Sequence, residues 1–230
     1  MNKIPLRFSI LLITFVIGIS FVVGWFYYQD SQKSQIILPN SRWEQIFFNG
    51  TEDRKFGTIN QTANLGGLME LRKTIVKKGN LEIRIWRGFG REPLEGVVFK
   101  QTDNHWSGLH LIETDIDKVE VENLSPPKSG WESFWQQLVD KEILTLRDSS
   151  EIKCGEAGID GVSYVVEINQ NKIYRTYMLS LSDYDGNCHE VKQIEDISSL
   201  IGEEFDSKNQ ECKRDEWFAC TKLNKSFRQK

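Results

Sequence analysis

The stretch LEIRIWR, residues 81–87, has an aliphatic side chain at every second position. Because successive side chains of a β-strand point to opposite faces, this two-residue period predicts a half-buried strand. Three similar runs follow after short polar turns, at residues 94–100, 106–113 and 117–121. Together, the four runs predict an antiparallel meander.

The chain beyond this meander predicts a helix, a hairpin and a second helix. In SGWESFWQQLVDKEIL, residues 129–144, apolar side chains recur with a helical period, and Ser129 and Glu132 have the spacing of a capping box. The hairpin lies in GVSYVVEINQNKIYRTYML, residues 161–179, and the second helix spans 189–205. We therefore expect an α+β domain with an antiparallel sheet (meander plus hairpin) and two principal helices, mainly on one face.

Before the meander, residues 8–28 form an uncharged apolar run, FSILLITFVIGISFVVGWFYY. As a helix it reaches about 31 Å, which matches the hydrocarbon core of a bilayer. The run ends in bulky aromatic residues instead of a small-residue cleavage site, which favours an uncleaved signal anchor over a cleaved signal peptide. Lys3 and Arg7 precede it, so we expect a cytoplasmic amino terminus and a single-pass protein of the cell membrane.

These features divide the chain into a cytoplasmic leader (1–7), the anchor in the lipid bilayer (8–28), a spacer (29–40) and an extracytoplasmic domain (41–230). The part after the anchor has 27 Lys plus Arg and 33 Asp plus Glu, a net charge of -6. Anionic lipid headgroups repel such a charge, so we expect the domain to stand off the membrane. The acidic balance also argues against a nucleic-acid partner.

All four cysteines, Cys154, Cys188, Cys212 and Cys220, lie on the predicted outer side, where disulfide bonds persist. Two disulfides are the simplest interpretation, and the sequence leaves all three pairings open. The absence of a Cys-x-x-Cys motif argues against a thioredoxin-like or zinc-ribbon site.

Arg84, Arg87 and Arg91 are the first candidate ligand-binding residues, because guanidinium groups present paired donors to a carboxylate or phosphate. The alternative is an ordinary solvated or salt-bridged strand edge. The surrounding RGFGRE, residues 87–92, lacks the third glycine and the following helix of a phosphate loop, so we expect a hairpin turn there.

His105, His110 and Glu113 are candidate metal ligands in QTDNHWSGLHLIETDID, residues 101–117. Two histidines five residues apart lie on opposite faces of a regular strand, so a shared metal would need a turn or bulge between them. The alternative is a set of polar residues at strand ends. The chain has no motif for a cofactor, and we expect none.

The sequence contains no signature of a nucleophilic active site. The leading hypothesis is therefore a non-catalytic binding or interaction module of the bacterial cell envelope, with an envelope protein or polymer as its partner. The alternative is an anchored extracytoplasmic hydrolase, with or without a metal, that uses the stretch from His105 to Asp117. A structural subunit of a membrane assembly is a third hypothesis, and it requires the aromatic stripe of residues 131–139 to be exposed.

Overall fold

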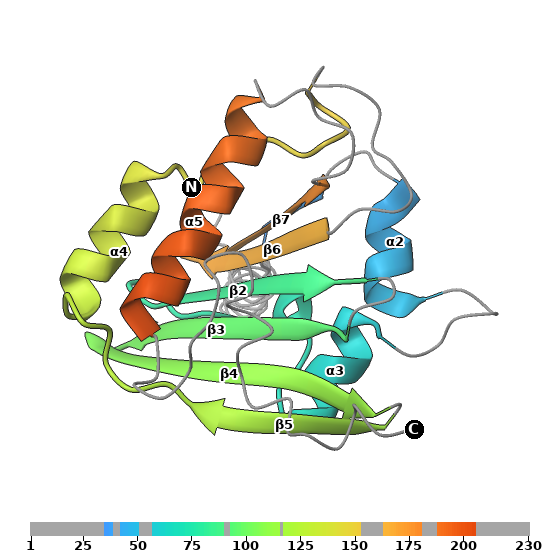
Figure 1. Cartoon of the computed structure of the whole chain (residues 1–230), viewed down its shortest axis with the longest axis horizontal. Coiled ribbons are helices and arrows are strands. Elements are labelled where there is room, and N and C mark those ends of the chain that lie inside the picture. The colour runs from blue at the N-terminus through green and yellow to red at the C-terminus, as the bar shows by residue number, and fades with distance from the viewer. Residues whose placement is uncertain are drawn as a thin grey trace, which may run out of the picture. The chain divides into compact units, whose positions relative to one another are not determined.

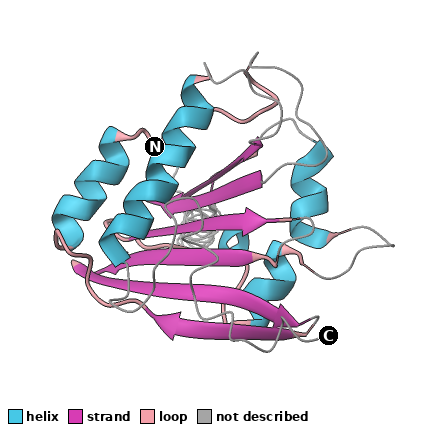
Figure 2. Cartoon of the chain, viewed as in Figure 1, coloured by secondary structure: helices cyan, strands magenta, loops and turns pink. Residues whose placement is uncertain are grey.

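The computed structural model describes residues 35–38, 42–50, 57–89, 93–115, 117–152, 163–180 and 188–205. Contacts divide the chain into two units, Met1–Gln35 and Ile36–Lys230, and nearly all described residues belong to the second. Figure 1 labels the helices and strands of this unit, and Figure 2 colours them by type.

Seven strands form one sheet in the order β1-β7-β6-β2-β3-β4-β5. The predicted meander and hairpin are confirmed, because the four runs form β2 to β5 in consecutive positions and β6 pairs with β7. The strands are β1 (Gln35–Ile37), β2 (Leu81–Gly88), β3 (Glu95–Thr102), β4 (His105–Asp115), β5 (Lys118–Asn123), β6 (Ser163–Gln170) and β7 (Ile173–Ser180).

The prediction of a purely antiparallel sheet is wrong, since the sheet is mixed. The five pairings from β7 through β6, β2, β3 and β4 to β5 are antiparallel. The unexpected strand is β1, at the β7 edge, within the stretch predicted as a spacer. A hairpin turn forces antiparallel pairing only on the strands that it joins, and β1 is far from β7 along the chain.

Helices cover both faces of the sheet, not mainly one as predicted. Leu81, Ile83 and Ile85 of β2 pack in one core cluster with α4 (Trp131–Asp140) and α5 (His189–Phe205). Trp86 of the same strand packs in a second cluster with α2 (Arg42–Asn49) and α3 (Ile59–Leu65). We call these the α4–α5 face and the α2–α3 face; Figure 1 shows the helix pairs over different parts of the sheet.

The central strand β2 is buried on both sides from Leu81 to Trp86, so the prediction of a half-buried strand is wrong. Two of its polar residues form a buried ion pair: Nη2 of Arg84 lies 2.7 Å from Oε1 of Glu82, and both side chains are nearly inaccessible to water. Burial of such charges is tolerated only when they are paired, because an isolated charge loses its hydration without compensation.

The helix α4 was predicted correctly, but its capping box was not. The N-cap residue is Gly130, and it makes no side-chain cap hydrogen bond. Glu132 accepts a hydrogen bond from Nε1 of Trp106 instead, at 2.9 Å. The aromatic stripe packs within the domain: Phe134 is buried, and Trp106 packs against the half-buried rings of Trp131 and Trp135.

The predicted membrane anchor at residues 8–28 lies outside the described part of the chain, so it stays a prediction. In the ranges that the structure describes, no helix is both long enough and apolar enough to cross a membrane. Cys188 is buried at the start of α5, while Cys154, Cys212 and Cys220 lie outside the described residues. The disulfide prediction therefore also stays open.

Candidate functional site

An open groove of about 810 Å³ lies beside the α2–α3 face of the sheet. Its size falls within the range of small-molecule and peptide pockets. Three segments supply its walls: the end of α2, the helix α3, and the connection that leads to the short 3-10 helix η1 (Leu71–Lys73). The lining residues are Phe48, Asn49, Thr58, Asn60, Gln61, Asn64, Gly67, Leu68, Met69, Glu70 and Lys73.

The groove is rich in amide side chains and carries no net charge. Nδ2 of Asn60 donates to Oδ1 of Asn49 at 2.9 Å, across the junction of α3 and α2. The charged lining residues Glu70 and Lys73 pair with each other at 2.7 Å. Amides offer both donors and acceptors, so this lining suits an uncharged polar ligand better than an ionic one.

Apolar side chains occupy another part of the lining. Met69 is 72% exposed, and Leu68 next to it is half-buried. Methionine adapts to differently shaped partners, because its chain is unbranched and its sulfur is polarisable. Met69 therefore adds an apolar contact to the polar groove.

Local sequence signals position the helix α3 that lines the groove. The hydroxyl of Thr58 accepts a hydrogen bond from the amide of Gln61 and caps the helix. At the other end, Gly66 passes so close to Leu111 of β4 that a Cβ atom would lie 2.3 Å from Cδ2 of that leucine. The absence of a side chain at this position lets the end of α3 lie against the sheet.

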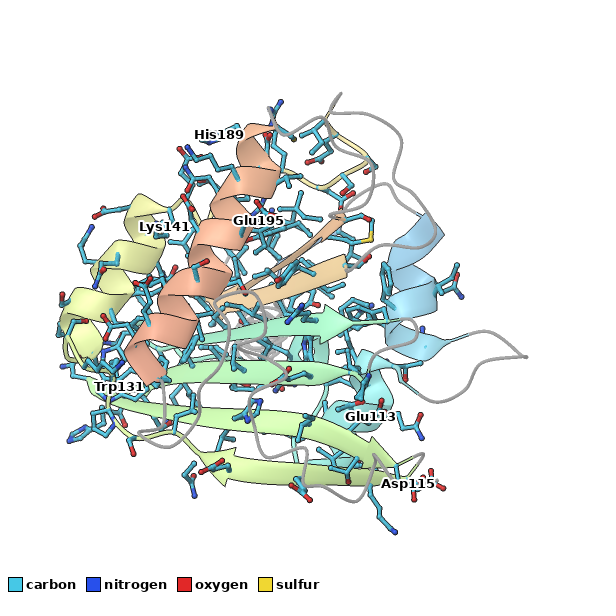
Figure 3. The ribbon with its side chains drawn as sticks, in the orientation of Figure 1. Glu113, Asp115, Trp131, Lys141, His189 and Glu195 are labelled. Atoms are coloured by element: carbon cyan, nitrogen blue, oxygen red, sulfur yellow. The ribbon has the colours of Figure 1, made fainter. Side chains whose placement is uncertain are left out.

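Glu113 of β4, labelled in Figure 3, connects α3 to the sheet through hydrogen bonds. Its Oε1 accepts hydrogen bonds from the amide of Gly57 and the hydroxyl of Thr62, both at 3.1 Å. Its Oε2 accepts one from the amide of Leu94 at 3.3 Å. Glu113, predicted as a metal ligand, thus joins three segments of the chain through hydrogen bonds.

The structure does not bring the three candidate metal ligands together. Trp106 contacts α4, so His110, an even number of residues further along β4, lies on the α4–α5 face. Glu113 contacts α3 on the other face, and His105 is exposed at the start of the strand. Among the described residues, no group of three His, Cys, Asp or Glu side chains could hold a metal ion.

The candidate arginines are also divided between the two faces. Arg84 is buried with Glu82, whereas Arg87, three residues further along the strand, points to the α4–α5 face. There, Arg87 lies directly opposite Glu95 of β3. Arg91 lies outside the described residues.

One candidate arginine, Arg87, and one candidate metal ligand, His110, both lie next to Glu95. Nε2 of His110 makes a short contact with Oε1 of Glu95, and both side chains are buried. Burial disfavours the charged ring and lowers the pKa of His110 to about 4. A neutral His110 that carries its proton on Nε2 donates to this carboxylate.

A second buried carboxylate, Glu167 of β6, lies on the α2–α3 face. It accepts hydrogen bonds from Nε1 of Trp86 at 2.8 Å and from the hydroxyl of Tyr174 at 3.0 Å. Burial raises the pKa of Glu167, while the charge of Arg84 and these hydrogen bonds oppose that shift. We assign this cluster a structural role, because its buried donors, Trp86 and Tyr174, both bond to the buried carboxylate within the cluster.

Sequence reasoning missed the groove, although one signal for it was present. Thr58 and Gln61 have capping-box spacing and mark the start of α3. The lining residues show no catalytic or metal-binding pattern, so nothing in the sequence marks them as a site.

Comparison with known proteins adds no family to this description. No family model matches the chain, and no curated protein matches it.

Proposed function

We propose that this chain is a single-pass, amino-terminally anchored protein of the cell envelope, and that its extracytoplasmic α+β domain is a non-catalytic binding module. The groove between α2, α3 and η1 is its binding surface. The partner is a segment of another envelope protein. The anchor and its orientation rest on the apolar run at residues 8–28 and on Lys3 and Arg7.

The lining of the groove is the observation that carries this proposal. A polypeptide presents uncharged donors and acceptors along its backbone, which suit Asn49, Asn60 and Asn64. It also presents apolar side chains, which suit the exposed Met69. Methionine is enriched in protein interfaces, whereas lone charges are depleted from their cores.

Amine-reactive crosslinking in intact membranes, followed by mass spectrometry, tests this proposal with two matched lysines. Lys73 lines the groove, its side chain is 71% exposed, and it pairs with an acid three residues away. Lys192 is also exposed, and it lies on α5, which packs on the α4–α5 face of the sheet. Both amines are therefore accessible, and only Lys73 is at the groove.

We expect reproducible crosslinks between one envelope protein and Lys73, with few at Lys192. Asn64→Arg, which adds a bulky charge to the lining, should reduce the crosslinks at Lys73 to the level at Lys192. Equal crosslinking of both lysines, or no effect of the substitution, contradicts a partner in the groove. Crosslinks to an envelope polymer alone would contradict a protein partner and indicate that the groove binds a polymer.

The second candidate function is the anchored hydrolase, and the His110–Glu95 pair is the observation that favours it. A carboxylate can orient a neutral imidazole so that its other nitrogen accepts a proton from water. The full chain, His110→Gln and Glu95→Gln would be assayed on ester, amide and glycoside substrates, with circular dichroism to verify folding. If the full chain turns over a substrate and both folded variants do not, hydrolysis by this pair is supported. If the variants retain the turnover, or if the full chain shows none, the pair is excluded as a catalytic site.

A further inference from the structure

The connection between η1 and β2 lies against the turn of the β6–β7 hairpin. Nδ2 of Asn169 donates to the carbonyl of Thr74 at 2.8 Å, and the amide of Gly79 donates to Oδ1 of Asn171 at 3.2 Å. These bonds hold both ends of residues 74–79 beside the turn formed by Asn171 and Lys172. The two segments thus form one surface at this end of the sheet, which we call the hairpin-turn end.

The hairpin-turn end is rich in cations, although the protein is acidic overall. Residues 71–80, LRKTIVKKGN, contain four cations and no acid, and Lys77 and Lys78 are exposed. Lys172 adds a cation from the turn itself. Of the cations in residues 71–80, Lys73 is neutralised by Glu70, but neither Lys77 nor Lys78 is within ion-pair distance of an acid among the described residues.

Exposed aliphatic side chains lie among these cations. Ile75, inside the segment that the two hydrogen bonds hold, is 55% exposed, and Ile173, the first residue of β7, is 41% exposed. The strand β1, next to β7 in the sheet, has two further exposed isoleucines, Ile36 and Ile37. Aliphatic and cationic side chains together are the composition of surfaces that lie in the interface of an anionic bilayer.

Only a short stretch of sequence separates β1 from the predicted anchor. Six residues separate Tyr28, the last residue of the apolar run, from Gln35, the first residue of β1. A chain of that length spans at most about 25 Å. If residues 8–28 span the bilayer, this length of chain limits how far Gln35 can lie from it.

We propose that the hairpin-turn end, with Ile75, Lys77, Lys78 and Ile173, contacts the surface of an anionic bilayer. This inference rests on the anchored topology of the proposed function. It revises the expectation that the acidic domain stands off the membrane. The surface potential of the bilayer falls off within a Debye length, so it acts on the nearest charges of the protein and not on the net charge of the domain. The bilayer contact would orient the domain relative to the membrane.

The test uses the full chain reconstituted in vesicles of phosphatidylcholine, with or without phosphatidylglycerol. A genetically encoded environment-sensitive fluorophore replaces Ile75, and a matched control places it at Glu195, on the exposed side of α5 (Figure 3). Quenching by brominated lipids reports contact with the bilayer. Flotation of the chain with the vesicles after alkaline extraction reports the anchor separately.

We expect brominated lipids to quench position 75 much more than position 195, and only in vesicles that contain phosphatidylglycerol. Each surface lysine contributes about a fivefold preference for anionic lipid, so Lys77→Glu combined with Lys78→Glu should reduce quenching at position 75 to the control level. Raising the salt concentration from about 0.1 M to about 1 M should do the same.

Equal quenching at both positions in a chain that floats with the vesicles overturns the bilayer contact and leaves the anchor intact. A blue-shifted but unquenched fluorophore at position 75 also overturns it, because protein then covers the residue. A chain that does not resist alkaline extraction refutes the anchored topology itself.

Discussion

Replacing Glu113 tests how the groove is attached to the sheet. In Glu113→Ala, the amides of Gly57 and Leu94 and the hydroxyl of Thr62 lose their acceptor. The three bonds are 3.1 to 3.3 Å long, at or just beyond the long end of the normal range, so we assign about 1 kcal/mol to each. The expected loss in the free energy of unfolding is therefore about 3 kcal/mol, or about 6 to 12 °C in Tm for a domain of this size.

Glu113→Gln refines this estimate. The amide oxygen can still accept from Gly57 and Thr62, but the amide nitrogen cannot accept from Leu94, so the loss should be about 1 to 2 kcal/mol. Glu120→Ala, at an exposed carboxylate on the adjacent strand β5, should change stability by less than about 0.5 kcal/mol.

Urea unfolding of the full chain in detergent, followed by circular dichroism, measures these losses. Hydrogen exchange locates them, since the amides of Gly57 and Leu94 should lose protection before amides of the central strand β2. If Glu113→Ala is as stable as Glu120→Ala and those two amides stay protected, the attachment of α3 through Glu113 is refuted.

Two further predictions concern the core. Gly96→Ala would place a Cβ atom 2.4 Å from the ring of the buried Trp86, so we expect a loss of about 1 to 3 kcal/mol in urea unfolding, and an unchanged midpoint would show that the ring can move. For His110, the folded pKa of about 4 lies below the ordinary histidine pKa of 6.5, so the unfolded chain binds the proton more readily. Stability should be complete above about pH 6.5 and fall by up to about 3 kcal/mol as the pH drops to 4. The same titration of His110→Gln should lack this component, and parallel pH profiles for the two proteins would contradict the buried neutral imidazole.

Local patterns predicted the elements whose side chains follow a simple period. The helix α5 has the predicted ends, since Val191, Ile194 and Ile197 follow the helical period and are buried. The β6–β7 hairpin was also predicted, and in the structure Asn171 and Lys172 adopt the positive φ angles of a two-residue turn. In these segments, local preference and tertiary packing agree.

Burial of the central strand could not be predicted in the same way. Glu82 and Arg84 give β2 the alternation of a half-exposed strand, yet they neutralise each other beneath the α2–α3 face. Alternation reports chemical type, and only the three-dimensional structure shows that two polar residues are partners. For the same reason, the sequence did not predict Glu95 as the partner of His110, because the two residues are 15 positions apart.

The groove could be predicted least. Its walls come from short helices, and α3 has only seven residues, too few for a periodic pattern to stand out. Its amide side chains carry no distinctive spacing, and their relation to Met69 depends on how α2, α3 and η1 pack. A binding surface of this kind becomes visible only after folding.

The most direct test of the proposed function is site-specific photocrosslinking in intact membranes. A photoreactive residue at Met69, in the groove, would be compared with one at Glu195, on the exposed side of α5. We expect a discrete crosslinked envelope protein from position 69 that is absent from position 195 and is lost in Asn64→Arg. Crosslinks from position 69 that lie only within the chain, or that match those from position 195, would contradict a binding function for the groove.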